Sequence, residues 1–171
     1  KPMSVAVAAA RSLRAEEYAG LCSLLFESAG IVLEADKQYL AETRLESVRA
    51  RLSVPSIAQL VEEVLKPTAS SDLRREVIEA MLNGETLFFR DLAMFDMLRT
   101  HLIPRLMAAR ESQRRIVIWS AACSTGQEPY SLAMFLDEHF PMLRGWDVEI
   151  LATDLSEAHL SRARAGVYSQ F

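Results

Sequence analysis

Two carboxylates stand where α/β proteins build ligand sites. Glu128 follows an apolar run at residues 116–120 and a small-residue segment at 121–126, so it falls in the first turn of a predicted helix. Asp154 ends a second apolar run at residues 148–153. Parallel strands bring their carboxyl ends to one edge of a sheet, where the N-termini of the following helices favour bound ligands. The pattern therefore predicts a nucleotide-type site to which both acids contribute.

The loop at residues 121–126 indicates the kind of ligand. It holds one glycine, Gly126, and lacks the Gly-x-Gly-x-x-Gly spacing that cradles a pyrophosphate. S-adenosylmethionine has a ribose, a base and a charged amino-acid tail but no pyrophosphate, so it fits such a loop. Glu128 then attracts the ammonium group, and Asp154 accepts hydrogen bonds from the ribose hydroxyls. The alternatives are an ordinary strand–helix turn for Glu128 and a cap of the helix at Ser156 for Asp154.

A third candidate segment, residues 83–91, combines a glycine, polar residues, two aromatics and an arginine without helical periodicity. We expect Phe88 and Phe89 to be buried, and Thr86 and Arg90 to point toward the site. The alternative is a hydrophobic hinge in which Arg90 and the following aspartate cap the next helix.

A basic stripe on a predicted helix is the fourth candidate. Lys37, Arg44 and Arg51 recur every seven residues, so they share one helix face. A positive face of this kind can dock an acidic helix. The alternative is a solvated surface in which Glu42 and Glu46 offset the positive charge.

Other chemistries find little support in the sequence. The three histidines, His101, His139 and His159, lie in helical patterns without a serine or cysteine at a matching distance, so we expect surface or boundary positions. No cluster of residues has the spacing of metal ligands. Cys22 and Cys123 lie far apart, which predicts no disulfide and a cytoplasmic location.

Composition and charge exclude further classes. The 171 residues include 19 Lys and Arg against 23 Asp and Glu, for a net charge of −4, so we expect no nucleic-acid partner. No apolar stretch approaches the length that spans a bilayer, so we expect no direct membrane insertion.

The periodicity of apolar residues predicts the elements that position these candidates. Helical patterns cover residues 15–29, 36–52, 56–65, 70–82 and 92–108, with Phe26, Leu52 and Leu102 among the inward positions. From residue 116 the pattern changes to strand (116–120), helix (128–138), strand (148–153) and helix (156–165). Such alternation predicts parallel strands with right-handed crossovers. The fold class is therefore α + α/β, an all-helical domain followed by the first βαβα portion of a Rossmann-like doubly wound domain.

Three segments together resemble the chemotaxis-receptor methyltransferases, the CheR family. The family shows Asn-Glu-Thr-x-Phe-Phe-Arg, then Ser-x-Gly-Glu-Glu-Pro-Tyr-Ser, then Ala-Thr-Asp followed by Ala-Arg-x-Gly-x-Tyr. The matching segments of this chain are Glu85-Thr86-Leu87-Phe88-Phe89-Arg90, Ser124-Thr125-Gly126-Gln127-Glu128-Pro129-Tyr130-Ser131, and Ala152-Thr153-Asp154 with Ala163-Arg164-Ala165-Gly166-Val167-Tyr168. The resemblance covers essentially the whole chain.

The resemblance implies transfer of a methyl group from S-adenosylmethionine to glutamate side chains of methyl-accepting chemotaxis receptors, with S-adenosylhomocysteine as the product. It implies cofactor contacts from Asn83, Gly84, Thr86, Arg90, Glu128 and Asp154. The family's asparagine falls at Gly84, and Asn83 lies one place earlier. Arg90 is the expected catalytic residue, because it can hold a carboxylate or the cofactor in line. Lys37, Arg44 and Arg51 would face the cytoplasmic helices of the receptor.

The expected domains are a helical domain at 12–66, a linker helix at 67–82 and a partial methyltransferase domain at 83–171. A doubly wound sheet needs about five or six strands, so we expect a fragment that is inactive and that self-associates through unpaired strand edges. One alternative function is a non-catalytic relative that binds S-adenosylmethionine or a receptor, as a glycine at position 84 would allow. A nicotinamide-dependent oxidoreductase with a helical cap is disfavoured by the single glycine of the loop.

Overall fold

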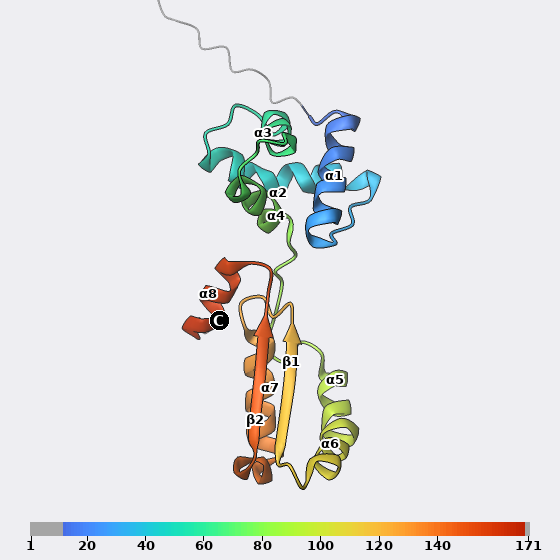
Figure 1. Ribbon diagram of the computed structural model, residues 1–171, viewed down its shortest axis with the longest axis vertical. Coiled ribbons are helices and arrows are strands. Elements are labelled where there is room, and N and C mark those ends of the chain that lie inside the picture. The colour runs from blue at the N-terminus through green and yellow to red at the C-terminus, as the bar shows by residue number, and fades with distance from the viewer. Residues whose placement is uncertain (1–11, 170–171) are drawn as a thin grey trace, which may run out of the picture. The chain divides into compact units, whose positions relative to one another are not determined.

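The computed structural model describes residues 12–169, and these form two compact units, which divide between Asn83 and Gly84 (Figure 1). Within residues 12–83 the first unit contains helices and no strand. Its elements are α1 (Ala15–Ala29), the short 3-10 turn η1 (Ala35–Lys37), α2 (Gln38–Arg51), α3 (Ile57–Leu65) and α4 (Ser71–Met81).

Local chemistry fixes where these helices begin and end. Arg14 precedes α1, and the Glu17 carboxylate accepts from its backbone N–H at 2.7 Å and from its Nε at 2.8 Å. Gly30 ends α1 with a φ of +66°, a conformation that glycine adopts at little cost. The side chains of Ser56 and Ser70 cap α3 and α4 by accepting from backbone N–H groups three residues later.

One apolar core holds the helical unit together. Leu21 and Leu25 of α1 are buried in one cluster with residues of α2 and α3, and Val77 and Met81 of α4 belong to the same cluster. The helix expected as a linker at 67–82 therefore contributes to this core.

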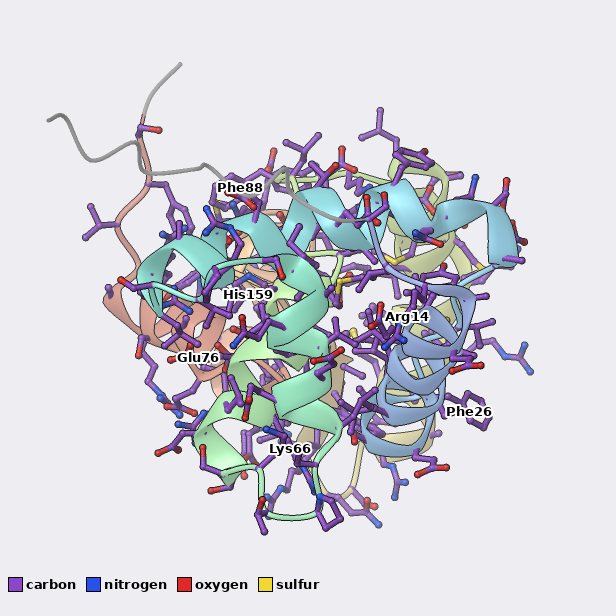
Figure 2. The ribbon with its side chains drawn as sticks, turned by 90° about the horizontal axis from the view of Figure 1, so that it is seen from above. Arg14, Phe26, Lys66, Glu76, Phe88 and His159 are labelled. Atoms are coloured by element: carbon purple, nitrogen blue, oxygen red, sulfur yellow. The ribbon has the colours of Figure 1, made fainter. Side chains whose placement is uncertain are left out.

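Two inward positions of the helical unit were predicted wrongly. Phe26 is 62% exposed and points away from α1 (Figure 2), and Leu52 is 40% exposed at the end of α2. Both lie in the last turn of a helix or just beyond it, where the helix no longer faces its neighbours. Helical periodicity alone does not reveal where the neighbouring helix stops.

The second unit contains the expected parallel pair of strands. β1 (Arg115–Ala121) pairs with β2 (Asp147–Thr153) in the register Arg115↔Asp147 to Ala121↔Thr153, and the connection between them contains α7 (Gln127–His139) and the short turn η3 (Pro141–Gly145). The strand–helix–strand–helix order, completed by α8 (Glu157–Ala165), confirms the predicted Rossmann-like beginning. Ahead of β1 lie α5 (Leu92–Met97), the π-helical segment η2 (Leu98–Leu102) and α6 (Ile103–Arg110).

The single helix expected over 92–108 is interrupted by η2. Pro104 explains the interruption, because proline has no N–H to donate and its ring clashes with the carbonyl four residues earlier, that of Thr100. The wider turn also changes the helical phase, so Leu102, expected to face inward, is exposed.

The two faces of the sheet differ. Ile116, Ile118 and Ile150 pack with α7, α5 and α6 into the second core. Val117, Trp119 and Leu151 alternate with these residues and are exposed, Trp119 at 67%. Within residues 12–169, no helix is long and apolar enough to cross a membrane.

Candidate functional site

The loop between β1 and α7 is a tight turn built from small residues. Ala122 and Ser124 have φ values of +57° and +49°, and Gly126 has a φ of +99°. The Cys123 N–H donates to the Thr153 carbonyl at 2.9 Å, so the loop continues the pairing of the strands past β1. The Gly126 N–H donates to the Cys123 carbonyl at 3.0 Å and closes the turn in front of α7. The loop is therefore held at the carboxyl ends of both strands.

Ser124 joins the three segments that the sequence singled out. Its backbone N–H donates to Oδ2 of Asp154 at 2.8 Å, and its Oγ donates to the carbonyl of Gly84 at 2.6 Å. The serine is 6% exposed. The β1–α7 loop, the end of β2 and the segment at 84–90 therefore meet at one place.

The side chain of Asp154 is largely covered, with 8% of it exposed. Oδ1 accepts from the Ser156 N–H at 2.8 Å, while Oδ2 accepts from Ser124. The cap of α8 itself is Ser156, whose Oγ accepts from the His159 N–H. Asp154 thus supports the start of α8 from outside the helix, and each carboxylate oxygen keeps a second lone pair. Its contact with a ribose stays a prediction.

Glu128 lies in the first turn of α7 and is exposed. Ser120, the last buried residue of β1, donates its hydroxyl to Oε1 at 2.7 Å and orients the carboxylate. Burial, followed by the charges of Asp154 and Glu128, raises the pKa of the Cys123 thiol, so the thiol stays neutral. The same negative field favours a cationic ligand at this edge of the sheet.

Gly84 lies close to the side chain of His159 in α8. A Cβ atom at this position would lie 2.6 Å from Cε1 of His159. His159 also places Nδ1 3.5 Å from Oδ1 of Asp154 and is partly buried, which agrees with the expected boundary position. The glycine at the place of the family's asparagine thus has a packing reason in this chain.

The rest of this segment has a mixed outcome. Phe89 packs on Phe95 with ring centroids 5.1 Å apart, and its N–H donates to Ser131 Oγ at 3.0 Å. Phe88, also expected to be buried, is instead 38% exposed and meets the ring of Tyr168 edge-on. It is less covered because the segment turns at Phe89, whose φ is +51°, and only one of two consecutive aromatics can enter the core.

The structure supports part of the alternative in which Arg90 and Asp91 cap the next helix, because Asp91 is the cap of α5 and Arg90 is not. The Arg90 side chain is exposed, and Nη1 donates to the carbonyl of Glu85 at 2.8 Å, which closes the segment into a loop. Asp91 caps α5 by accepting from the Met94 N–H. Thr86 is half-buried in this loop. The cofactor contacts of Thr86 and Arg90 stay predictions, as does that of Asn83, which is exposed.

The basic stripe expected on one helix is divided between two elements, because Lys37 lies in η1 while Arg44 and Arg51 lie in α2. Two of its three cations also have partners in α4. Nη1 of Arg44 donates to the carbonyl of Met81 at 2.7 Å, at the C-terminal end of α4. Nη2 of Arg51 lies 2.9 Å from Oε2 of Glu76, the α4 residue labelled in Figure 2. Nζ of Lys37 lies 3.6 Å from Asp36. Binding of an acidic partner by these three residues stays a prediction.

The acidic residues expected to offset the stripe have other partners. Glu42 accepts from the Leu13 N–H and from Gln38, and Glu46 pairs with Arg49. Seven-residue spacing therefore indicates a shared helix face but does not determine which charges pair.

Sequence reasoning missed Ser120, Ser124 and His159 as parts of the site. Ser120 and Ser124 lie in the recognised motif, so their place at the strand end was the available signal. His159 lies near Gly84 only because α8 folds back over the strand ends.

Comparisons with known proteins cover both units. The family model described as "CheR methyltransferase, all-alpha domain" matches residues 16–82, and that described as "CheR methyltransferase, SAM binding domain" matches residues 84–171. The boundary between the two matches falls next to the boundary between the compact units.

Similar full proteins are named as chemotaxis methyltransferases. The chain is 43% identical over 147 residues to "Chemotaxis protein methyltransferase 1" of Pseudomonas aeruginosa, covering 84% of this chain and 53% of that protein. It is 40% identical over 155 residues to "Chemotaxis protein methyltransferase 1" of Vibrio cholerae, with coverages of 90% and 55%. It is 34% identical over 158 residues to "Chemotaxis protein methyltransferase" of Borreliella burgdorferi, with coverages of 91% and 56%. The chain therefore spans about half the length of the curated relatives it matches.

Proposed function

The chain belongs to the CheR methyltransferase family, and from this premise we propose that its gene product transfers a methyl group from S-adenosylmethionine to glutamate side chains of methyl-accepting chemotaxis receptors. The products are glutamate methyl esters and S-adenosylhomocysteine. The observation that supports this most is the junction at Ser124, because it holds together the segments that carry Asp154, Glu128 and Arg90.

The residues at this junction suit S-adenosylmethionine. The exposed carboxylate of Glu128 is held by Ser120 and can bind the ammonium group of the ligand's amino-acid tail. Asp154 keeps acceptor capacity for the ribose hydroxyls beyond its two backbone hydrogen bonds. Gly84, Thr86 and Arg90 belong to the segment bonded to this loop, and Asn83 directly precedes it.

The chemistry needs orientation more than proton transfer. When bound, S-adenosylmethionine supplies an electrophilic methyl group on its sulfonium. A glutamate side chain with a pKa of about 4.3 is already ionised at neutral pH, so the chain need not provide a general base. In this proposal the guanidinium of Arg90 holds a carboxylate through two parallel N–H donors, and the ring of Phe88, two residues away, is an apolar surface that would keep water out.

We further propose that the partners are the cytoplasmic helices of these receptors and that the protein works in the cytoplasm. Within the stripe, Lys37 is partly exposed and Arg51 is exposed, with 40% and 59% of their side chains accessible. Glutamate-rich receptor helices would attract such a face electrostatically, and added salt would weaken this attraction by screening the charges. Arg44 contributes indirectly, because it supports α4.

The 171-residue chain by itself is proposed to self-associate and to bind S-adenosylmethionine weakly. Two observations support this. One face of the sheet exposes the apolar residues Val117, Trp119 and Leu151, which a second copy could cover. The described sheet has only two strands, which have little stability alone and leave strand edges that another chain can pair with. Sedimentation at micromolar concentration, with a parallel titration of S-adenosylmethionine, tests this. A monomer that binds the ligand tightly would contradict it.

The function is tested on the full-length gene product. Calorimetric titrations with S-adenosylmethionine, S-adenosylhomocysteine and NAD should give binding of the first two and none of the third. Receptor-containing membranes incubated with methyl-labelled S-adenosylmethionine should gain a label that mild alkali releases, as an ester requires. Binding without transfer would indicate a non-catalytic relative, and binding of NAD would indicate an oxidoreductase.

A further inference from the structure

The segment that follows α8 has no role in the proposed chemistry, yet it returns to the site. Gly166 ends α8 with a φ of +61°, and its N–H donates to the carbonyl of Arg162. This left-handed turn reverses the chain, so Tyr168 comes back to the loop between β1 and α7.

Tyr168 touches two of the segments that form the site. Its hydroxyl donates to the carbonyl of Thr125 at 2.8 Å. Its ring packs against that of Phe88 in an edge-to-face arrangement, with centroids 5.0 Å apart and planes at 83°. A Cβ atom on Gly126 would lie 2.7 Å from the Tyr168 hydroxyl oxygen, so the glycine lets the tyrosine approach.

Tyr130 makes the reciprocal contact from α7. Its hydroxyl donates to the carbonyl of Ala163 at 3.1 Å, and a Cβ atom on Gly166 would lie 2.9 Å from the hydroxyl oxygen. The rings of Tyr130 and Tyr168 meet edge-on, 5.8 Å apart. Tyr168 thus lies against Gly126, which precedes α7, and Tyr130 of α7 lies against Gly166, which follows α8. Only Tyr168 reaches both the β1–α7 loop and Phe88.

We infer that Tyr168 is a positioning residue, which holds the β1–α7 loop and the Phe88 segment in the arrangement that the S-adenosylmethionine site requires. The inference rests on the proposed function, because it names a residue that acts on that site without touching the ligand. Burial raises the pKa of Tyr168, so its hydroxyl remains a donor to Thr125 across the neutral range.

Amide hydrogen exchange on the full-length gene product tests the positioning directly. The Gly126 N–H, bonded to the Cys123 carbonyl, reports on the loop, and the Gly166 N–H reports on the end of α8. The Phe140 N–H, bonded to the Leu136 carbonyl, reports on the core of the same unit. Tyr168→Phe removes one hydroxyl and keeps the ring, so exchange at Gly126 should become about two- to tenfold faster while Phe140 is unchanged. Tyr130→Phe, the matched control, should affect Gly166 and spare Gly126.

Ligand binding supplies the second measurement. Tyr168→Phe should raise the Kd for S-adenosylmethionine about two- to tenfold, and Tyr168→Leu should raise it further and also speed exchange of the Phe89 N–H, which bonds to Ser131 Oγ. Tyr130→Phe should leave the Kd within about twofold of the original. Unchanged exchange at Gly126, equal acceleration at Phe140, or equal Kd values for the two phenylalanine variants would overturn the inference. A parent protein that does not bind S-adenosylmethionine would overturn the proposed function instead, and the exchange pattern would still decide the role of Tyr168.

Discussion

The two units place their predicted functional residues in different ways. In the α/β unit, Asp154, Glu128 and the segment at 84–90 come together at the strand ends, because Ser124 bonds to two of the three and belongs to the loop before the third. In the helical unit, Arg44 and Arg51 lie on α2 and Lys37 lies in the turn η1 before it, but Arg44 and Arg51 bond to neighbouring α4. The topology of a parallel sheet brings residues at the strand ends close together. A shared helix face also places residues side by side, but it does not determine whether they bind another protein or other parts of the same chain.

The hydrophobic cores of the two units also differ, in how completely the surrounding elements cover them. The helical core is closed by four α-helices and buries Leu21, Leu45 and Val61 completely. The sheet of the α/β unit buries one face against α7 and exposes Val117 and Trp119 on the other.

Stability experiments can distinguish unfolding of the two units, because the two tryptophans, Trp119 and Trp146, both lie in the α/β unit.

Asp154→Ala should have the largest effect. It removes two hydrogen bonds from backbone N–H groups to a largely covered carboxylate, so the tryptophan-monitored unfolding free energy should fall by about 3 kcal/mol. The affinity for S-adenosylmethionine should fall by about 1–3 kcal/mol, measured by calorimetry where the variant is folded. Asp91→Ala, which removes only the cap of α5, should cost about 1 kcal/mol and leave affinity unchanged. Unchanged affinity in Asp154→Ala would limit that residue to supporting α8.

Arg90→Ala should lower methyl transfer about ten- to hundredfold, because one charged donor to the carboxylate or cofactor is lost. Its exposed side chain bonds within its own loop, so the unfolding free energy should change by less than about 0.5 kcal/mol. Arg99→Ala removes an exposed pair with Asp96 in the same unit and should leave both quantities unchanged. Loss of activity in proportion to loss of stability would make Arg90 structural.

Arg44→Ala should destabilise the helical unit by about 1–2 kcal/mol, because the carbonyl of Met81 loses its donor at a partly buried helix end. Circular dichroism should detect this loss, and tryptophan fluorescence of the other unit should not. Arg51→Ala breaks an exposed ion pair with Glu76 and should cost less than about 1 kcal/mol. If the Arg44→Ala and Arg51→Ala variants were equally stable, the hydrogen bond of Arg44 to Met81 would contribute no more to stability than a surface ion pair.

Charge reversal at Lys37 and Arg51, with Arg44 kept, should have the smallest effect. The apparent KM for receptor should rise about threefold, more at low salt, with an unchanged Kd for S-adenosylmethionine. Reversal at Lys66 and Arg75, exposed cations elsewhere on the same unit, changes the net charge equally and should leave the KM alone. If both pairs of substitutions had the same effect, or neither had any, the stripe would be an ordinary solvated face.

Both strands, most of the helices and their order along the chain were predictable from the sequence alone. Apolar periodicity identified the helices and both strands, and the alternation after residue 116 required the strands to be parallel. The same rule placed Asp154 and Glu128 at one sheet edge, because the carboxyl ends of adjacent parallel strands must lie together. These features follow from local conformational preference and chain connectivity, which a single sequence contains.

The hydrogen-bond partners of those residues were not predictable from the sequence and come from the folded structure. That Asp154 accepts from the Ser124 and Ser156 amides, and that Arg44 supports α4, depends on distances between segments far apart in the chain. The same holds for Gly126 and Gly166, whose missing side chains admit Tyr168 and Tyr130. Hydrogen bonds and close packing act over a few ångströms, whereas periodicity specifies only the face on which a residue lies. A sequence pattern therefore limits which residues can become neighbours, and the packing of the folded chain determines which of them form hydrogen bonds.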